Sequence, residues 1–483
     1  MAPRVRTVRG ARERIGRSMK GYIMRPMSSP RMSLLLVCGL LFAPLFSGCA
    51  TMGAMDGSTG KAKNVILLIG DGMGPSHFGA AWFYSTRVLG KNLRMVEVMN
   101  AGHTAYLVND TADAIVAESA AAAGQIATGR RMTKGSVSMA ADGKTPVQTI
   151  MEIGRHKGLA TGLVTSSEIT DATPAVFASH VSHRSDEASV AEQELRMRVE
   201  VLMGGGKQFF LPEISAGKRK DGRNLLDEAE ASGYAVVSDA EELTAATGPK
   251  ILGLFNMGNM AYEIDRGATS EPSLAEMTAK TLSVLSRNSK GFFAMIEGGR
   301  IDHAAHQNDA AGTIRDILAF DEAIGVAVDF ARRNPDTLVV VTADHETAGM
   351  ALFGDSREQL ETALTAIQRA KASFEVISKA FGKSPTAEKI KEKVEEYLGI
   401  QINEGEARTV ANDTIRKLDP ANRSNPYLHT LAFVLRPYLC VGWIGQMHTA
   451  SPLFAFGMGP GSERIKGLLH NTQLFDVIKA AME

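Results

Sequence analysis

The clearest structural signal in the chain is the segment Asn64-Val65-Ile66-Leu67-Leu68-Ile69-Gly70-Asp71-Gly72-Met73-Gly74. Residues 65–69 form an unbroken apolar run, without the alternation that a strand with one wet face shows. The run therefore predicts a strand that is buried on both faces, as in a parallel sheet. Glycines follow it at once and allow a tight turn, and that turn holds one acid, Asp71.

Three further apolar runs end in the same way, in a short polar segment. Residues 292–296 lead into Glu297, residues 338–341 into Thr342-Ala343-Asp344-His345, and residues 159–164 into Thr165-Ser166-Ser167-Glu168. Stretches with helical character, such as 275–285 and 313–330, lie between them. Alternating strands and helices predict an α/β fold, with a doubly wound and mostly parallel sheet flanked by helices.

The acids behind these runs are expected to meet at one edge of the sheet. In open α/β sheets the carboxyl ends of the strands form the ligand-binding edge. Asp71, Glu297 and the pair Asp344-His345 would gather there. One acid after a strand is commonly a helix cap or part of a solvated turn. Three of them after separate strands, one with an adjacent histidine, favour a metal site.

Further candidate ligands stand elsewhere in the chain. Asp302 and His306 are four residues apart, so on a helix they share one face and can reach the same ion. Alone, such a pair is more often solvated. His448 precedes another apolar run, 452–456, and on its own it indicates a hydrogen-bonded loop histidine rather than a ligand.

These residues stand in motifs that resemble those of the alkaline phosphatases, from about Lys61 to the C-terminus. The matching segments, in the family's order, are residues 64–74, Glu118-Ser119-Ala120-Ala121-Ala122-Ala123, Asp171-Ala172-Thr173-Pro174, Glu297-Gly298-Gly299-Arg300-Ile301-Asp302-His303-Ala304-Ala305-His306, Thr342-Ala343-Asp344-His345-Glu346-Thr347 and His448-Thr449. One such segment would be weak evidence, whereas six in order are specific. The resemblance implies an alkaline-phosphatase-like fold and the hydrolysis of phosphate esters.

The resemblance also implies two zinc ions and one magnesium ion around a serine nucleophile, Ser119. By this likeness the first zinc is held by Asp302, His306 and His448, the second by Asp71, Asp344 and His345, and the magnesium by Asp71, Thr173 and Glu297, with Asp171 acting through water. Arg184 stands where the family has its phosphate-binding arginine. The ligand types agree, since histidine with carboxylate suits zinc and an all-oxygen set suits magnesium.

This set of residues predicts a phosphomonoesterase that works in two steps. Uncatalysed hydrolysis of phosphate monoesters is very slow, so the site must stabilise much negative charge. Two metal ions can hold the attacking and leaving oxygens, and a zinc lowers the pKa of an oxygen bound to it. Ser119 would form a phosphoserine that water then hydrolyses, while Arg184 binds two phosphoryl oxygens. A structural role for Ser119, as N-cap of the alanine-rich helix near Ala120, stays open beside the catalytic one.

Three positions depart from the family's pattern. Glu118 stands where Asp usually precedes the nucleophile, and this leaves the pose of Arg184 open because that acid orients the arginine. The histidine motif continues with Thr449-Ala450, where glycine is usual after the threonine. His303 stands where some members have Lys, and beside Asp171 it would influence the ion of the third site. None of the three removes a predicted ligand.

Alternative functions share part of this pattern. A phosphodiesterase of the same superfamily has the same metal centre and differs in the distal pocket residues. A sulfatase is disfavoured, because the segment after Ser119 lacks the Cys/Ser-x-Pro-x-Arg pattern. A catalytically inactive, metal-binding surface lipoprotein is disfavoured by the intact Ser119 and Arg184.

The N-terminal segment predicts an export signal of the lipoprotein type. Residues 1–48 contain nine basic residues and one acid, and their uncharged run 33–46 is followed by small residues before Cys49. This run of about 14 residues is shorter than the roughly 20 that span a bilayer. Cleavage before Cys49 would leave a lipidated cysteine, a flexible tether over residues 49–60, and an exported protein in the periplasm or cell envelope. An uncleaved anchor or an ordinary signal peptide is the alternative.

The composition is that of a globular enzyme. Hydrophobic residues make up 44% and charged residues 22%, which excludes a disordered or collagen-like chain, and three cysteines exclude a disulfide scaffold. The formal net charge is zero, but removal of residues 1–48 leaves 44 basic and 52 acidic residues, a charge of −8. We therefore expect small phosphate monoesters as ligands and no nucleic-acid partner. The family likeness suggests a homodimer.

Residues 61–483 form the predicted catalytic domain, with about 354–445 as an inserted, mainly helical subdomain. One apolar stripe at spacings that fit one helical face consists of Leu360, Leu364, Ile367, Phe374, Ile377 and Phe381. A second stripe, Ile390, Val394 and Leu398, follows a stop at Gly382 and a new start at Pro385. Core packing or a dimer contact is the expected role of this insert.

Overall fold

The computed structural model describes residues 60–414 and 426–483. The predicted signal peptide, residues 1–48, and the lipid attachment site Cys49 lie outside the described residues, as does nearly all of the tether. Within the described ranges, no helix is both long and apolar enough to cross a membrane.

A ten-stranded sheet forms the framework, in the order β14-β2-β13-β8-β1-β7-β3-β4-β6-β5. Its strands are β1 (Asn64–Gly70), β2 (His103–Val108), β3 (Ala160–Glu168), β4 (Val201–Gly205), β5 (Ala235–Val237), β6 (Ile251–Leu254), β7 (Phe292–Gly298), β8 (Thr337–Thr342), β13 (Leu453–Met458) and β14 (Gly467–His470). All neighbours pair in parallel except β13, which runs antiparallel to both β8 and β2. The predicted class, an α/β fold with a mostly parallel sheet, is confirmed.

The apolar run of residues 65–69 forms β1 in the interior of this sheet, and every residue of β1 is buried. The strand pairs with β7 on one side and with β8 on the other. The register places Ile69 beside Glu297 and beside Thr342. The carboxyl ends of the three strands therefore lie next to one another, and the polar residues that follow them share one edge.

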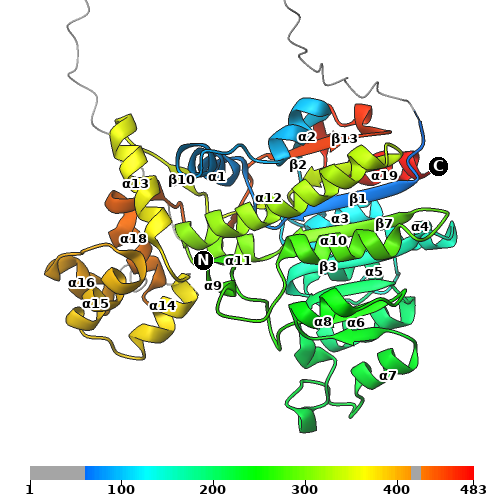
Figure 1. Cartoon of the computed structure of the whole chain (residues 1–483), viewed down its shortest axis with the longest axis horizontal. Helices are drawn as coiled ribbons and strands as arrows, with labels where there is room; N and C mark the ends of the chain where they lie inside the picture. Colours follow the sequence, from blue (N-terminus) through cyan, green and yellow to red (C-terminus); the bar gives the residue numbers. More distant parts are fainter. Residues whose placement is uncertain (1–59, 415–425) are drawn as a thin grey trace, which may run out of the picture. The chain divides into compact units, whose positions relative to one another are not determined.

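Helices cover both faces of the sheet. Phe292 and Phe293 are successive residues of β7, so their side chains point to opposite faces. The ring of Phe292 contacts Phe330 of α12 (Ala310–Arg333), and the ring of Phe293 contacts Phe177 of α5 (Ala172–Ala178). Figure 1 shows α12 and α10 (Leu274–Leu285) running along the strands. The other helices of the framework are α1 (Pro75–Arg87), α2 (Met95–Ala101), α3 (Ser119–Thr128), α4 (Ile150–His156), α6 (Glu187–Met197), α7 (Leu225–Ala231), α8 (Ala240–Ala245), α9 (Glu263–Arg266), α11 (Arg300–His306) and α19 (Thr472–Met482).

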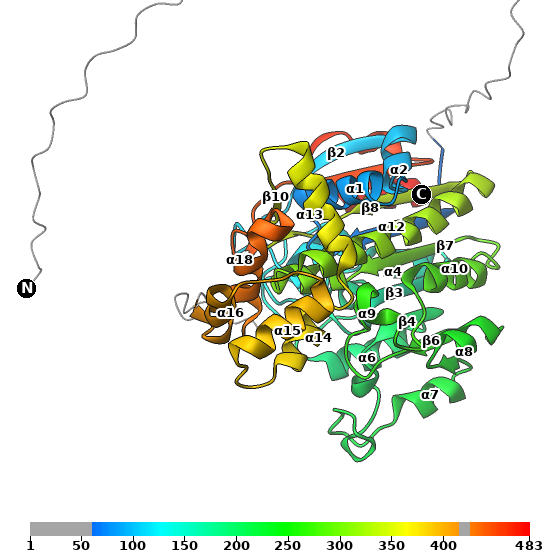
Figure 2. The same ribbon diagram turned by 60° about the vertical axis from the view of Figure 1, so that its left-hand side comes forward.

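The described part of the insert is mainly helical. Its helices are α13 (Arg357–Arg369), α14 (Phe374–Phe381), α15 (Ala387–Leu398), α16 (Glu404–Ala411) and α18 (Leu428–Leu439). They group together in both views, in yellow and orange (Figures 1 and 2). Their apolar side chains form a second hydrophobic cluster, which includes Tyr84 of α1 and Ile314 of α12. The insert is therefore packed onto the framework.

The first apolar stripe predicted for the insert is divided between two helices. α13 ends at Arg369, and α14 begins at Phe374 with Ser373 as its N-cap. The N–H groups of Ser373 and Phe374 donate to Asp265 and Asp309 of the framework, and these bonds redirect the chain. The spacing of the apolar residues did not reveal the break between α13 and α14, because residues 367 and 374 are seven apart, close to two helical turns.

Candidate active site

Three buried acids lie at the carboxyl ends of β1, β7 and β8: Asp71 and Asp344 follow their strands, and Glu297 is the last residue but one of β7. The N–H of Gly72 donates to Asp344 Oδ1 at 3.1 Å and so joins the turn after β1 to the end of β8. Gly72 has a φ of +69°, and a Cβ there would lie 2.7 Å from Thr347 Oγ1. Only glycine fits this turn, which brings two of the acids together.

His345 lies between these acids and Ser119. Its Nε2 is 3.4 Å from Asp71 Oδ1 and 3.3 Å from Asp344 Oδ2. The same nitrogen is 3.1 Å from Ser119 Oγ, while Nδ1 is 3.2 Å from Thr347 Oγ1. Residues that are far apart in sequence thus converge on one imidazole nitrogen.

Thr347 defines the tautomer of His345. The Thr347 hydroxyl donates its hydrogen to Asp302 Oδ1, so it can only accept from the imidazole. Nδ1 of His345 therefore carries the hydrogen, and Nε2 presents a lone pair to the space that it shares with Asp71 and Asp344. A lone pair that faces two carboxylate oxygens fits a cation.

A second set of possible ligands, Asp302, His306 and His448, lies beside the first. His448 reaches this place because β12 (His448–Thr449) pairs antiparallel with β9 (Glu346–Thr347). The pairing stacks the ring of His448 on that of His345 at a centroid distance of 3.8 Å. Asp302 Oδ2 is 3.3 Å from His306 Nε2, and Asp302 Oδ1 is 3.7 Å from His448 Nε2.

The backbone fixes the tautomers of both histidines. His306 Nδ1 donates to the carbonyl of Gln446 at 2.5 Å, and His448 Nδ1 donates to the carbonyl of Ala117 at 3.0 Å. Their Nε2 atoms, 3.0 Å apart, therefore face each other as two lone pairs when the rings are neutral. Such an arrangement is repulsive by itself and becomes favourable around a cation. The residues present fit a metal ion at this point.

The charges of the carboxylates lead to the same conclusion. Burial raises the pKa of Asp71 well above its ordinary value, and the neighbouring Asp344, Asp302 and Glu297 raise it further. Burial also raises the pKa of Asp344 to about 7 and that of Glu297 to about 8. Divalent cations would remove this repulsion and let the carboxylates ionise together.

Ser119 is buried and is the first residue of α3. The N-cap of this helix is Glu118, whose carboxylate accepts from the backbone N–H groups of Ala120 and Ala121. The structural role considered for Ser119, that of N-cap, therefore belongs to Glu118. The Ser119 hydroxyl faces His345 instead.

Two carboxylates hold the guanidinium of Arg184. Its Nη1 donates to Glu118 Oε2 at 2.9 Å, and its Nη2 donates to Asp171 Oδ1 at 2.6 Å. Burial alone would lower the pKa of Arg184, but Asp171 and Glu118 raise it above its ordinary value, so the side chain stays charged. The longer Glu118 thus orients the arginine, and this departure from the family's pattern leaves the pose of Arg184 defined.

The residues predicted for the third ion lie beside this centre. Glu297 accepts from the hydroxyl of Thr165, and the hydroxyl of Thr173 is buried without a hydrogen-bond partner among the described residues. Asp171 is engaged with Arg184 and with the N–H of Ala172. In the described ranges, the groups of three acids or histidines tight enough for an ion are Asp302, His306 and His448, and Asp71, Asp302 and His345. The magnesium set stays a prediction.

Asn308 is one of the residues that position the ligands and that sequence reasoning missed. Its Nδ2 donates to the carbonyl of Gly445 at 2.7 Å, and its Oδ1 lies 2.6 Å from His429 Nδ1. This amide ties the segment before His448 to the turn after His306. No spacing rule indicates an amide that acts through the backbone, so the sequence held no signal for it beyond its closeness to His306.

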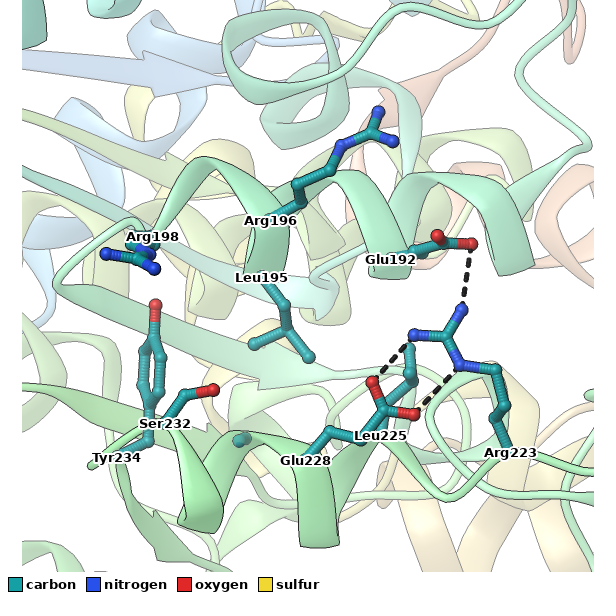
Figure 3. Close-up of a pocket in the computed structure, with 10 residues that line it drawn as sticks. Glu192, Leu195, Arg196, Arg198, Arg223, Leu225, Glu228, Ser232 and Tyr234 are labelled. Carbon is teal, nitrogen blue, oxygen red and sulfur yellow. Dashed lines mark hydrogen bonds and ion pairs between the residues drawn. The ribbon is translucent and has the colours of Figure 1, made fainter.

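A separate cavity of about 300 Å³ lies between α6 and α7. Arg196, Arg198 and Tyr234 line it, and Arg223 in its wall pairs with Glu228 (Figure 3). It shares no residue with the centre described above. It therefore adds nothing to the predicted chemistry.

The comparisons with known proteins agree with this geometry. A model of the alkaline phosphatase family matches residues 62–483. The chain belongs to this family. Alkaline phosphatase 3 of Bacillus subtilis (strain 168) is 31% identical over 483 aligned residues, which cover 95% of this chain and 98% of that protein. The alkaline phosphatase of Escherichia coli (strain K12) is 34% identical over 360 residues, which cover 64% of this chain and 76% of that protein.

Solved structures show the same likeness. The crystal structure of Thermus thermophilus alkaline phosphatase has a TM-score of 0.81 to this chain at 32% identity, and the match covers 91% of this chain and 96% of that one. The cold-active alkaline phosphatase of Shewanella sp. has a TM-score of 0.74 at 27% identity, over 87% of this chain and 100% of that one. The predicted family, fold and enzyme class are confirmed. The chain is a phosphatase, and its family implies metal ions in the centre.

Proposed function

We propose that this alkaline phosphatase hydrolyses phosphate monoesters to an alcohol and inorganic phosphate through a phosphoserine on Ser119. One observation supports this most directly: Ser119 Oγ lies 3.1 Å from Nε2 of His345, whose ring stacks on that of His448. A buried hydroxyl beside a lone-pair donor and several carboxylates is the arrangement of an activated nucleophile.

In this proposal two zinc ions and one magnesium ion belong to the centre. Asp302, His306 and His448 would hold one zinc, Asp71, Asp344 and His345 the other, and Asp71, Asp171, Thr173 and Glu297 the magnesium. Bound zinc would supply a lowered pKa for the serine hydroxyl and charge stabilisation for the leaving oxygen. The histidine-containing sets suit zinc, and the all-oxygen set suits magnesium.

The side chains of this chain perform the remaining work. The Ser119 oxygen attacks phosphorus in line with the ester oxygen, which leaves as the alcohol. The backbone N–H groups of Ala120 and Ala121 already donate to Glu118 and are not free for the phosphoryl group. The N–H groups of Arg184 that bond neither Glu118 nor Asp171 therefore bind the phosphoryl oxygens. Water then cleaves the phosphoserine and restores the Ser119 hydroxyl. Two in-line displacements give net retention at phosphorus.

The test compares a monoester with a diester. Wild-type enzyme should hydrolyse 4-nitrophenyl phosphate much faster than bis(4-nitrophenyl) phosphate at equal concentration, and Ser119→Ala should lose this activity by a factor of about 10³ or more. A preference for the diester would favour the alternative function, a phosphodiesterase. Monoesterase activity that survives complete removal of zinc would exclude the metal-dependent scheme.

We further propose export of the protein to the periplasm or cell envelope, with cleavage before Cys49 and a lipid on that cysteine. The basic and then apolar order of residues 1–48 supports this. Labelling with a radioactive fatty acid in a bacterial host should mark the wild type and not Cys49→Ser. Equal labelling of both proteins would exclude lipidation at Cys49.

A homodimer is the expected assembly. Three aromatic or apolar side chains lie in register across neighbouring strands: Leu468 beside Tyr106, and Tyr106 beside Phe454. Tyr106 and Leu468 are 53% and 68% exposed, which suits burial against a second copy. Light scattering should give twice the chain mass for the wild type and the monomer mass for Tyr106→Glu.

A further inference from the structure

Arg300, the first residue of α11, connects the helical insert to the active site. Its side chain is 7% exposed, and its guanidinium lies over the ring of Tyr262 at 3.6 Å. Its Nη2 donates to Glu375 Oε2 of α14 at 3.0 Å, and its Nη1 donates to His303 Nδ1 at 3.0 Å. One buried guanidinium thus binds the insert on one side and an active-site histidine on the other.

The contact with Arg300 defines the tautomer of His303. Guanidinium groups only donate, so His303 Nδ1 accepts, and the hydrogen of the neutral ring lies on Nε2. That Nε2 faces Asp171 Oδ2 at 4.0 Å. The other oxygen of Asp171 accepts from Arg184. A series of polar neighbours, hydrogen-bonded at every step except that between His303 and Asp171, therefore runs from the insert to the arginine that is proposed to bind phosphate.

The position of Glu375 is set by the framework. The N–H of Ser373 donates to Asp265 Oδ1 at 3.0 Å, and the N–H of Phe374 donates to Asp309 Oδ2 at 2.7 Å. These bonds hold the first turn of α14 against the framework, directly before Glu375. The carboxylate is therefore presented to Arg300 by a fixed backbone.

We propose that Glu375, contributed by the insert, is a positioning residue of the active site. Through Arg300 and His303 it holds the Asp171 carboxylate, and with it the guanidinium of Arg184. This inference rests on the proposed function, because it takes Arg184 as the phosphate-binding residue. The insert thereby takes part in phosphate binding in addition to its packing role.

The decisive variant is Glu375→Ala in the full, metal-loaded enzyme. Arg300 would lose the carboxylate that its Nη2 bonds and would hold His303 less firmly. Arg184 binds the phosphoryl group in the ground state and in the transition state, so a looser Arg184 should raise KM and leave kcat within about twofold. We expect KM for 4-nitrophenyl phosphate and the inhibition constant of inorganic phosphate to rise together, by about five- to tenfold.

Two variants serve as controls. Glu375→Gln keeps an acceptor oxygen for Arg300, and it should recover most of the phosphate affinity. Lys379→Ala removes the other partner of Glu375, an exposed amine 2.7 Å from Oε1, and should leave KM and the inhibition constant at the wild-type values. Binding of phosphate is also measured without turnover, from the rise in melting temperature with phosphate concentration.

The outcomes separate the possible roles of Glu375. A lower melting temperature for Glu375→Ala with unchanged KM and phosphate affinity would show a merely structural contact and would overturn the proposal. An equal effect of Lys379→Ala would overturn it as well. Failure of the proposed function would give a different result. In that case Arg184→Ala would have the same KM and the same phosphate affinity as the wild type.

Discussion

Replacement of Glu118 by alanine should destabilise the protein by more than the loss of a helix cap. The Glu118 carboxylate accepts four hydrogen bonds. Oε1 accepts from the N–H groups of Ala121 and Gly135 at 2.8 and 2.9 Å. Oε2 accepts from the N–H of Ala120 at 3.1 Å and from Arg184 at 2.9 Å. One side chain therefore caps α3, holds the loop that follows this helix and orients Arg184, the residue that is proposed to bind phosphate.

The expected loss can be built from these contacts. Removal of an N-cap lowers the free energy of unfolding by about 1 kcal/mol. Removal of a charge-assisted hydrogen bond such as that to Arg184 lowers it by about 1.5–3 kcal/mol. The two side chains are 16% and 30% exposed, so water replaces only part of the lost bond. We expect Glu118→Ala to lose about 2–4 kcal/mol in total.

Urea unfolding at matched metal loading measures this loss, with a simple cap as the control. Asp239 caps α8 through the N–H of Glu242 at 2.8 Å, and among the described residues no arginine bonds to its carboxylate. Asp239→Ala should therefore lose only about 1 kcal/mol. A loss for Glu118→Ala no larger than that of the control would refute the coupling between the cap and Arg184.

The contribution of Glu118 should vanish only in acid. Burial by itself would raise the pKa of Glu118, but Arg184 and the N–H groups of Gly135, Ala121 and Ala120 lower it below its ordinary 4.5. A lowered folded-state pKa means that the stabilisation is complete above that ordinary value and is lost as the pH falls through the folded value. The difference in stability between wild type and Glu118→Gln should therefore be constant near neutral pH and shrink in acid.

Other substitutions test other parts of the centre. Asn308→Ala should lower zinc affinity about 10- to 100-fold, measured by competition with a chelator, because the segment before His448 loses its tie. His448→Ala should remove one equivalent of zinc in a metal analysis and lower kcat/KM by about 10² or more, whereas a full zinc content would exclude it as a ligand. Burial and the neighbouring Glu168 raise the pKa of Glu187 to about 8, so the folded wild type loses stability as the pH rises from the ordinary 4.5 through that value. Glu187→Gln should then gain roughly 1–2 kcal/mol over wild type at about pH 9 in urea unfolding, with the gain falling toward zero at about pH 5.

The fold could be predicted because its central strands are buried on both faces. Burial on both faces forces unbroken apolar runs such as residues 65–69 and 338–341, and these are visible in a sequence without any neighbour. The short strand β14 (Gly467–His470) was not predicted. It lies at the edge of the sheet, where Leu468 is exposed, so no burial pattern marks it.

The first layer of the site could be predicted for a related reason. Asp71, Glu297 and Asp344 lie at the carboxyl ends of neighbouring parallel strands, and parallel pairing leaves these ends little freedom. The residues behind them could not be predicted. Thr347 acts by receiving the hydrogen of His345, and Asn308 acts by holding a backbone carbonyl 137 residues away in sequence. Such roles depend on where two loops meet, which local spacing does not encode.

The geometry of the centre also explains how groups that repel one another are kept together. The two imidazole lone pairs of His306 and His448 lie 3.0 Å apart, and burial raises the pKa values of Asp71 and Asp344 beside His345. Four of the proposed ligands are held by a bond that needs no ion: a backbone carbonyl for His306 and His448, a hydroxyl for His345, and the N–H of Gly72 for Asp344. The framework therefore keeps these mutually repelling groups together before an ion binds. A bound divalent cation would then attract each of them. It follows that the bonds behind the ligands, rather than the ligands alone, determine how tightly the metal ions are held.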